Sequence, residues 1–247
     1  MKKILLVLGF CSFVSVASIA QLNKVAIISV WGDKNLSDNP MDTKMYEKLM
    51  KDTSFNISSI VYQFDELMRN DVIPQFPFPF MPKEEVVATE GYQDLIELST
   101  YKHGVNTYYI VPAKDYVPLA AFGVGLQDDE AILKSFELLP DDIDGVMIAY
   151  INFNMVDAGG VGPYSAKKVQ AYCNIKIFNK AGKRIFKLKE SAPSDKKVSA
   201  VGGIITEPKK ITPLVLQASD NLFADIKKTL PKKLAKMAKK IDKSKED

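Results

Sequence analysis

The chain has 247 residues, of which 33 are lysine or arginine, 30 are aspartate or glutamate, and 47% are hydrophobic. It is long enough to bury a sizeable core in one or two domains, at the usual ~100–200 residues per domain. Because it has a single histidine, and only Cys173 follows residue 20, the familiar zinc-binding spacings and an internal disulfide in the remainder are excluded.

The first twenty residues, MKKILLVLGFCSFVSVASIA, place two lysines before an apolar run and small residues at positions 18 and 20. We therefore expect residues 1–20 to be a signal peptide and the protein to be exported, to the periplasm or, as alternatives, to the medium or the outer membrane. Cys11 lies inside the apolar run and follows Phe10, which does not fit lipidation. No later stretch reaches the ~18 apolar residues of a membrane-spanning helix.

Charge is distributed unevenly along the chain. Residues 227–247 hold nine lysines against three acidic residues, a net charge of +6, whereas residues 21–226 carry a net charge of −5. We expect residues 21–226 to form a single domain and residues 227–247 to form a lysine-rich amphipathic tail.

The first element expected after the signal is a strand. Residues 24–31, KVAIISVW, form an apolar run closed by Gly32 and Asp33, as in a strand covered on both faces. Residues 41–51 predict a helix with a thin apolar stripe. From residue 57 to residue 68 apolar side chains recur at steps of three and four, which predicts a second, clearer helix.

The next segment, PQFPFPFMP at residues 74–82, alternates prolines with Phe76, Phe78 and Phe80. Proline has no backbone donor, so we expect this segment to run extended on the surface. Its phenylalanines either fold back over the protein's own core or form an exposed strip that contacts a partner or a bilayer.

Three further elements precede the second half of the chain. A helix is expected from Pro82 to His103, which we expect to cap it, followed by a strand at 107–112. Residues 128–140 begin with three acidic residues, place apolar residues on one face and end at a proline, which predicts another helix.

From residue 145 the apolar residues recur at every second position. Residues 145–156, 167–178 and 183–189 therefore predict three strands of an antiparallel meander. In the first two strands one face is apolar, and the opposite face includes asparagine and lysine.

The first two of these strands are separated by DAGGVGPYSAKK, residues 157–168. A phosphate-binding loop would lead into a helix, whereas this one joins two strands. We therefore interpret Gly159, Gly160 and Gly162 as parts of a flexible connecting loop.

A final amphipathic helix is expected over residues 211–226, and Pro231 is expected to kink or restart it. The lysine-rich tail beyond it either lies on anionic lipid, binds an acidic partner or forms a solvated helix end. The tail residues expected to make such a contact are Lys232, Lys233, Lys236, Lys239 and Lys240.

Candidate catalytic residues are few. Ser165 and Lys168 form S-x-x-K and Ser219 begins S-D-N, but the K-T-G of the penicillin-recognising signature does not follow. The acidic stretch at residues 141–145 fails the calcium-loop pattern, and Cys173 is predicted to be buried on the apolar face of its strand. We expect no catalytic residue, no metal and no cofactor.

The order of elements resembles exported α/β domains such as the curli-secretion lipoprotein, the penicillin-binding-protein activator lipoprotein and the N-terminal domain of the Tol translocation protein. The resemblance is carried by KVAIISVW, TYYIVPAKDYVPLAAF, DDIDGVMIAYINF and CNIKIFNKAGKRIFKL. It implies a non-enzymatic assembly or scaffold role in the cell envelope, and it offers no functional residue to carry across.

These observations predict an α/β (α+β) fold with a mixed sheet of about five strands, a C-terminal antiparallel meander, helices packed on the sheet and a long C-terminal helix. The expected function is binding of an envelope protein or an anionic membrane surface, without catalysis. The alternatives are a periplasmic carrier of a small apolar ligand or lipid, and a hydrolase. Nucleic acid is not an expected partner, because aromatic residues are not interleaved with the basic ones.

Overall fold

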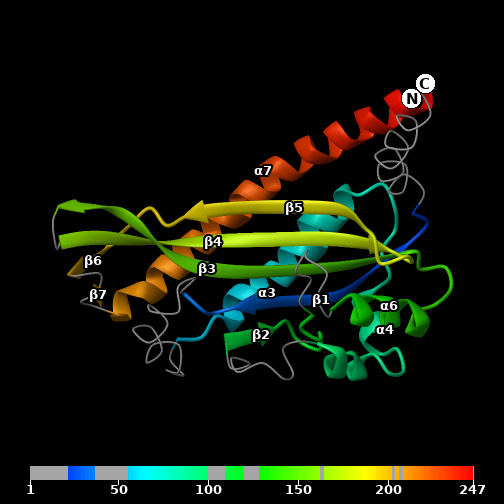
Figure 1. The fold of residues 1–247 in the computed structure, drawn as a ribbon, viewed down its shortest axis with the longest axis horizontal. Helices are drawn as coiled ribbons and strands as arrows, with labels where there is room; N and C mark the ends of the chain where they lie inside the picture. Colours follow the sequence, from blue (N-terminus) through cyan, green and yellow to red (C-terminus); the bar gives the residue numbers. More distant parts are fainter. Residues whose placement is uncertain are drawn as a thin grey trace, which may run out of the picture.

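The computed structural model describes residues 22–36, 55–99, 109–119, 128–161, 164–201, 204–205 and 208–246. Within them the chain forms a mixed sheet of seven strands with helices packed on it (Figure 1), which confirms the predicted α+β class. The expected signal peptide at 1–20, the helix over 41–51 and the cap at His103 lie outside the described residues.

The sheet has the strand order β2-β1-β3-β4-β6-β7, and β5 also pairs with β4. Strand β1 runs parallel to β3, and all other pairs are antiparallel. The strands are β1 (Val25–Asp33), β2 (Ile110–Pro112), β3 (Gly145–Val161), β4 (Tyr164–Asn179), β5 (Arg184–Pro193), β6 (Val198–Val201) and β7 (Ile204–Ile205).

The predicted meander is confirmed as β3, β4 and β5, but two short strands were missed. Strand β4 pairs with β5 over Gln170–Phe178 and with β6 over Tyr164–Lys167. Because β4 has 16 residues and β5 only 10, the free part of the β4 edge is filled by β6, which in turn pairs with β7.

The glycine-rich stretch lies largely inside the sheet. Gly159 and Gly160 belong to strand β3, so the flexible loop expected at these two glycines is wrong. Gly162 is outside the described residues. Both described glycines have positive φ, at 96° and 151°, and the pairing register shifts between Asp157 and Gly160. A Cβ at Gly160 would collide with the Tyr164 carbonyl, so glycine is required at this bulge.

The helical segments follow the sequence prediction in part. Helix α3 continues into a π-helix, η1, and the expected helix over 82–103 is wrong: it is divided into α4 and η3 by a turn at Gly91, whose φ is 77°. The segments are α3 (Ser58–Leu67), η1 (Met68–Val72), η2 (Ile73–Gln75), α4 (Lys83–Val87), η3 (Gln93–Leu98), α6 (Asp128–Leu138), η5 (Pro208–Lys210) and α7 (Ile211–Glu246).

Helix α7 is continuous, so the expected restart at Pro231 does not occur and the expected boundary at residue 226 falls inside the helix. Pro231 is exposed, and solvent can bond to the carbonyl that loses its donor there. No helix in the described part of the chain is long and apolar enough to cross a membrane.

Helices α3 and α7 cover one face of the sheet, and Figure 1 shows them passing behind β3, β4 and β5. The residues of β3 and β4 that point towards these helices were predicted from the period of two and are fully buried. They include Met147, Ala149, Ile151, Phe153, Val169, Ala171, Cys173, Ile175 and Ile177. This part of the core therefore lies between the meander and the two helices, and the buried residues Val146, Ile148 and Phe178 extend it onto the other face of the sheet.

The Phe-Pro segment folds back over this core. The backbone N–H of Val25 donates to the Pro79 carbonyl at 3.0 Å, and the N–H of Met81 donates to the Val25 carbonyl at 2.8 Å. Phe76 and Phe78 are only 7% and 6% exposed. An exposed strip containing these two rings is therefore wrong, because the Pro79 carbonyl and the Met81 N–H pair with the start of β1 and hold the segment against the core.

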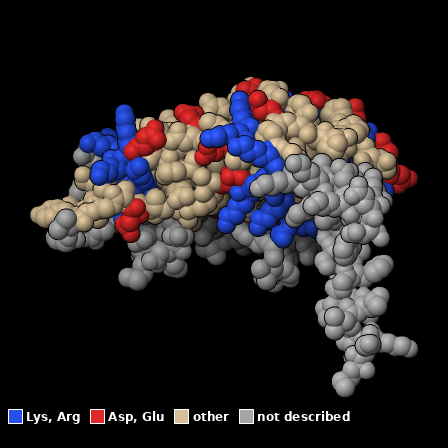
Figure 2. Space-filling view, turned by 90° about the horizontal axis from the view of Figure 1, so that it is seen from above, with Lys and Arg blue, Asp and Glu red and all other residues tan. Residues whose placement is uncertain are grey.

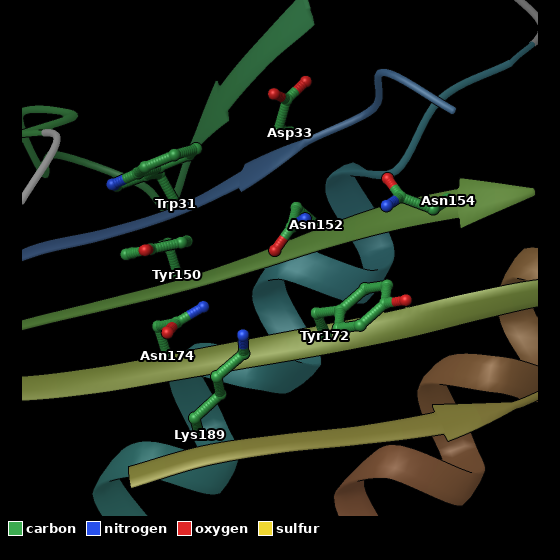
Figure 3. A pocket seen from close by; sticks show the side chains of 8 residues that line it. All are labelled: Trp31, Asp33, Tyr150, Asn152, Asn154, Tyr172, Asn174 and Lys189. Carbon is green, nitrogen blue, oxygen red and sulfur yellow. The ribbon is translucent and has the colours of Figure 1, made fainter. Parts of the chain in front are cut away.

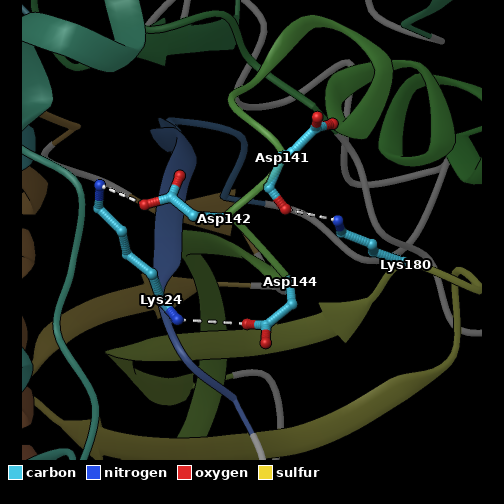
Figure 4. A network of polar contacts seen from close by, with 5 residues as sticks. All are labelled: Lys24, Asp141, Asp142, Asp144 and Lys180. Atoms are coloured by element: carbon cyan, nitrogen blue, oxygen red, sulfur yellow. Dashed lines mark hydrogen bonds and ion pairs between the residues drawn. The ribbon is translucent and has the colours of Figure 1, made fainter.

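The acidic loop before β3 holds the start of β1 (Figure 4). The Asp144 carboxylate accepts hydrogen bonds from the backbone N–H groups of Asn23 and Lys24, and the Lys24 ammonium pairs with Asp142 at 3.1 Å. Lys180, in the β4–β5 turn, donates to the Asp141 carbonyl at 2.8 Å. The loop thus joins three strand ends through hydrogen bonds and an ion pair.

Replacing Phe76 by alanine tests the core role of the Phe-Pro segment. The Phe76 ring contacts Phe186 with centroids 5.2 Å apart, as well as Phe78 and Phe80. We expect Phe76→Ala to lower the free energy of unfolding in urea by about 3–5 kcal/mol, because it leaves a cavity among these rings.

The matched control is Tyr62→Ala, which removes an aromatic ring that is 58% exposed on α3. Its expected effect is about 0.5 kcal/mol or less. Equal urea midpoints for the two variants would contradict the burial of the Phe-Pro segment.

Candidate functional site

The sheet face turned away from α3 and α7 carries a polar and aromatic pocket of about 300 Å³ (Figure 3). In Figure 3 the labelled side chains lie on one side of the strands and the α3 ribbon lies on the other. The pocket is lined by Trp31, Asp33, Tyr150, Asn152, Asn154, Tyr172, Asn174 and Lys189.

Strand register places these residues in two rows across the sheet. The first row, from β1 through β3 and β4 to β5, consists of Trp31, Tyr150, Asn174 and Lys189. The second row consists of Asp33, Asn152 and Tyr172. Directly opposed residues in adjacent strands have Cβ atoms about 4.5–5.5 Å apart, so each row forms a continuous line of contacts.

The floor of the pocket is a fixed aromatic stack. The rings of Trp31 and Tyr150 lie 4.7 Å apart at an angle of 11°. The indole N–H of Trp31 donates to the Leu119 carbonyl at 2.9 Å, and the Lys176 ammonium lies 5.4 Å from the Tyr150 ring centroid. Because both rings are less than 10% exposed, the stack sets the shape of the site.

The walls offer neutral hydrogen-bonding groups. Asn152 and Asn154 are half-buried on β3, and Asn174 is 8% exposed on β4. Each asparagine amide has both donor and acceptor atoms, which complement the hydroxyl and amide groups of a ligand. Tyr172 adds a half-buried phenol ring. The arrangement suits binding of an uncharged polar group on an aromatic floor.

Charged groups stand at the two ends of the pocket. Burial raises the pKa of Asp33 to about 6, although a hydrogen bond from the Asn35 backbone N–H at 2.8 Å lowers it in part. Lys189, at the opposite end, is exposed. Burial also raises the pKa of Tyr150 to about 12, so its hydroxyl stays protonated at neutral pH.

None of the residues expected from the sequence to make contacts lines this pocket. Phe76 and Phe78 are in the core, and Phe80 is partly buried beside them. On α7 the Lys233 ammonium pairs with Glu190 at 2.6 Å and Lys232 is exposed, while the side chains of Lys236, Lys239 and Lys240 are outside the described part.

The other candidates for chemistry are kept apart or buried. Ser165 lies in β4 opposite Ala200, and the Ser219 hydroxyl donates to the Val215 carbonyl within α7. Cys173 is fully buried as predicted, and burial raises the pKa of its thiol. Among the described residues, no group of three or more histidine, cysteine, aspartate or glutamate side chains could hold a metal ion.

Sequence reasoning missed the pocket, although part of its signal was visible. Asn152 and Asn174 stood out as polar positions on the faces opposite the apolar ones. Trp31 and Asp33 gave no signal, because they end an apolar run that reads as a buried strand. Only the parallel pairing of β1 with β3 brings Asp33 beside Asn152.

Comparison with known proteins gives low similarity. No protein-family model and no curated protein sequence matches the chain. Three similar solved structures are a neuraminyllactose-binding hemagglutinin homolog from Helicobacter pylori, the hypothetical protein CT253 from Chlamydia trachomatis and lipoprotein GNA1162 from Neisseria meningitidis.

The first of these structures has 12% identity and a TM-score of 0.35, with 90% of each chain covered. The second has 11% identity and a TM-score of 0.29, covering 84% of this chain and 98% of its own. The third has 12% identity and a TM-score of 0.27, covering 82% and 99%. None of these names is among the families that the sequence resembles, so that resemblance stays a prediction.

The raised pKa of Asp33 predicts a pH-dependent stability. Because the folded pKa of about 6 exceeds the ordinary aspartate pKa of 3.8, the contribution of Asp33 to stability is fully present below pH 3.8 and is lost as pH rises through about 6. Relative to Asp33→Asn, the wild-type free energy of unfolding should therefore fall between about pH 4 and pH 7, by at most about 3 kcal/mol.

Urea unfolding of both proteins across this pH range measures the difference between their free energies of unfolding. The contributions of all other titrating groups cancel in this difference. The asparagine retains an oxygen that can accept from the Asn35 N–H, so the variant changes the charge with little change in shape. If the free energies of unfolding of the two proteins changed in parallel with pH, the raised pKa of Asp33 would be contradicted.

Proposed function

We propose that this chain is an exported, non-enzymatic binding protein of the cell envelope, and that its binding surface is the polar face of the sheet. The proposal is supported above all by one observation: the sheet face opposite α3 and α7 presents asparagine amides between two charged ends, beside a rigid aromatic floor. Export is supported by the pattern of residues 1–20.

The composition of the pocket favours a partner with neutral polar groups. A hydrogen-bonding face that is fixed before the partner arrives loses little entropy on binding, so modest contacts yield useful affinity. Lys189 and Asp33 at opposite ends disfavour a ligand that carries a large charge of either sign. The partner is therefore expected to present hydroxyl or amide groups at this surface.

The lysine-rich part of α7 supports a second contact, with an anionic membrane. Lys227 pairs with Asp71 at 2.9 Å and Lys233 with Glu190, so these two lysines tie α7 to the body of the protein. Figure 2 shows basic side chains gathered in two groups on this side of the molecule. We expect the membrane surface to contact those lysines of α7 that take no part in these two ion pairs.

Site-specific photo-crosslinking in cells tests the proposed binding face. A benzophenone amino acid at Tyr172 is expected to crosslink to an envelope component, because this half-buried ring lines the pocket. The readout is a product of increased mass after irradiation, identified by mass spectrometry.

The same amino acid at Tyr62 is the matched control, since it replaces a tyrosine on α3, on the covered side of the sheet. Crosslinked products that are identical at the two positions, or absent at Tyr172, would remove the support for the polar face as the binding surface.

Sedimentation with vesicles tests the membrane contact. We expect weak binding to anionic vesicles that disappears at about 1 M salt, where charges are screened beyond ~3 Å. Replacing Lys232, Lys236, Lys239 and Lys240 by glutamine should abolish it, since each lysine near the surface contributes about 1 kcal/mol. The variant keeps Lys227 and Lys233, whose ion pairs hold α7 to the body.

The matched control replaces four exposed lysines of the body, Lys183, Lys187, Lys196 and Lys197, by glutamine. It carries the same change in net charge and should sediment like the wild type. Equal loss of binding in the two variants would show that net charge alone, and not α7, directs the interaction.

A further inference from the structure

A second pocket, of about 260 Å³, lies beside the end of the Phe-Pro segment, separate from the polar face. Its apolar lining comes from strand β1, the segment after the π-helix and the Phe-Pro segment, and includes Ile27, Ile73, Phe80 and Met81. This size, just below the usual range of ~300–1,000 Å³ for ligand pockets, suits a small organic molecule.

The same pocket is lined by two cations on different elements. Arg69 belongs to the π-helix η1, and Lys83 is the first residue of α4. The Lys83 side chain is only 12% exposed, and its ammonium lies 4.7 Å from the centroid of the Tyr116 ring. A half-buried ammonium over an aromatic ring is held in position rather than free in solvent.

One carboxylate is shared between these two cations. The Asp65 Oδ2 atom forms an ion pair with Arg69 Nη2 at 3.2 Å and accepts a hydrogen bond from Lys83 Nζ at 3.2 Å, and the Asp65 side chain is 4% exposed. The cluster of Asp65, Arg69 and Lys83 thus has one positive charge in excess. Glu84 also lines the pocket, but this residue is exposed to solvent.

The pairing within the cluster is incomplete. Asp65 Oδ1 and Arg69 Nε are buried and have no hydrogen-bond partner. Buried polar atoms without partners are rare, and arginine can bind a carboxylate through two parallel N–H groups. Here Asp65 engages only Nη2 of that fork, so Arg69 retains donors for a second carboxylate.

We propose that this pocket binds a small amphipathic carboxylate. Its carboxylate accepts hydrogen bonds from Arg69 and Lys83 and neutralises their excess charge, while its apolar part packs on Ile27, Phe80 and Met81. A neutral molecule of the same shape leaves that charge unpaired, and a cation is repelled by it. This site is independent of the polar sheet face.

Octanoate, 1-octanol and octylamine are the probes, because they share an alkyl chain and differ in the charge of the head group. The protein is labelled with 13C-methyl methionine, and the Met81 signal is identified from Met81→Leu. Octanoate should shift the Met81 methyl resonance and leave that of Met147, which is buried in the sheet core, unchanged.

Octanol should bind at least about tenfold more weakly than octanoate, because hydrogen bonds to a charged group are stronger than those to a neutral one. Octylamine should not shift the signal at all. The proposal is overturned if octanoate leaves the Met81 resonance unmoved, or if octanol shifts it over the same range of concentration.

Two variants change the charge of the pocket in opposite directions. Lys83→Met should abolish the octanoate shift, whereas Glu84→Gln should tighten octanoate binding about two- to fivefold, because it removes an exposed negative charge from the rim. Lys134→Met, which removes a lysine that is 48% exposed on α6, is the control and should bind like the wild type.

If Lys83→Met fails to fold, Glu84→Gln and the three probes decide the outcome, since Glu84 is exposed and has no role in the core. Wild-type affinity in a folded Lys83→Met protein, or weaker octanoate binding in Glu84→Gln, would overturn the proposal.

Discussion

The alternation of side chains along β3 and β4 is the constraint on which the rest of the structure depends. Odd-numbered residues such as Ile151 and Cys173 are fully buried against α3 and α7. Because successive side chains in a strand point to opposite faces, this burial forces Asn152 and Asn174 onto the other face. A shift of one residue in either strand would turn the amides towards α3 and α7 and the apolar side chains away from these helices.

Backbone hydrogen bonding explains why the Phe-Pro segment belongs to the core. Proline makes the segment unsuitable as an ordinary strand, yet its carbonyl groups remain acceptors. Pro79 accepts from Val25, and Met81 donates back to the Val25 carbonyl, so the segment lies along the start of β1. This contact buries Phe76 and Phe78, and it also places Phe80 and Met81 at the wall of the second pocket.

The two pockets differ in how charged side chains are distributed in them. The pocket on the sheet face separates Asp33 and Lys189 at its ends and fills the middle with amides. The second pocket concentrates Arg69 and Lys83 around a single buried carboxylate, Asp65, with Glu84 exposed at the rim, which leaves a positive excess within the cluster of Asp65, Arg69 and Lys83. Neutral polar ligands suit the first arrangement, and anionic ligands suit the second.

The sequence by itself determined the α+β class, the meander, α3 and the burial of Cys173, because local periodicity reports which face of an element is apolar. It did not determine β6 and β7, which form through short pairings. It also did not determine the division of the helix expected over 82–103, which is caused by the turn at Gly91. Both pockets were decided by the tertiary structure alone. Asp33 lies beside Asn152 only because strands far apart in the chain pair, and Lys83 reaches Asp65 only because the Phe-Pro segment folds back, and no local pattern records such contacts.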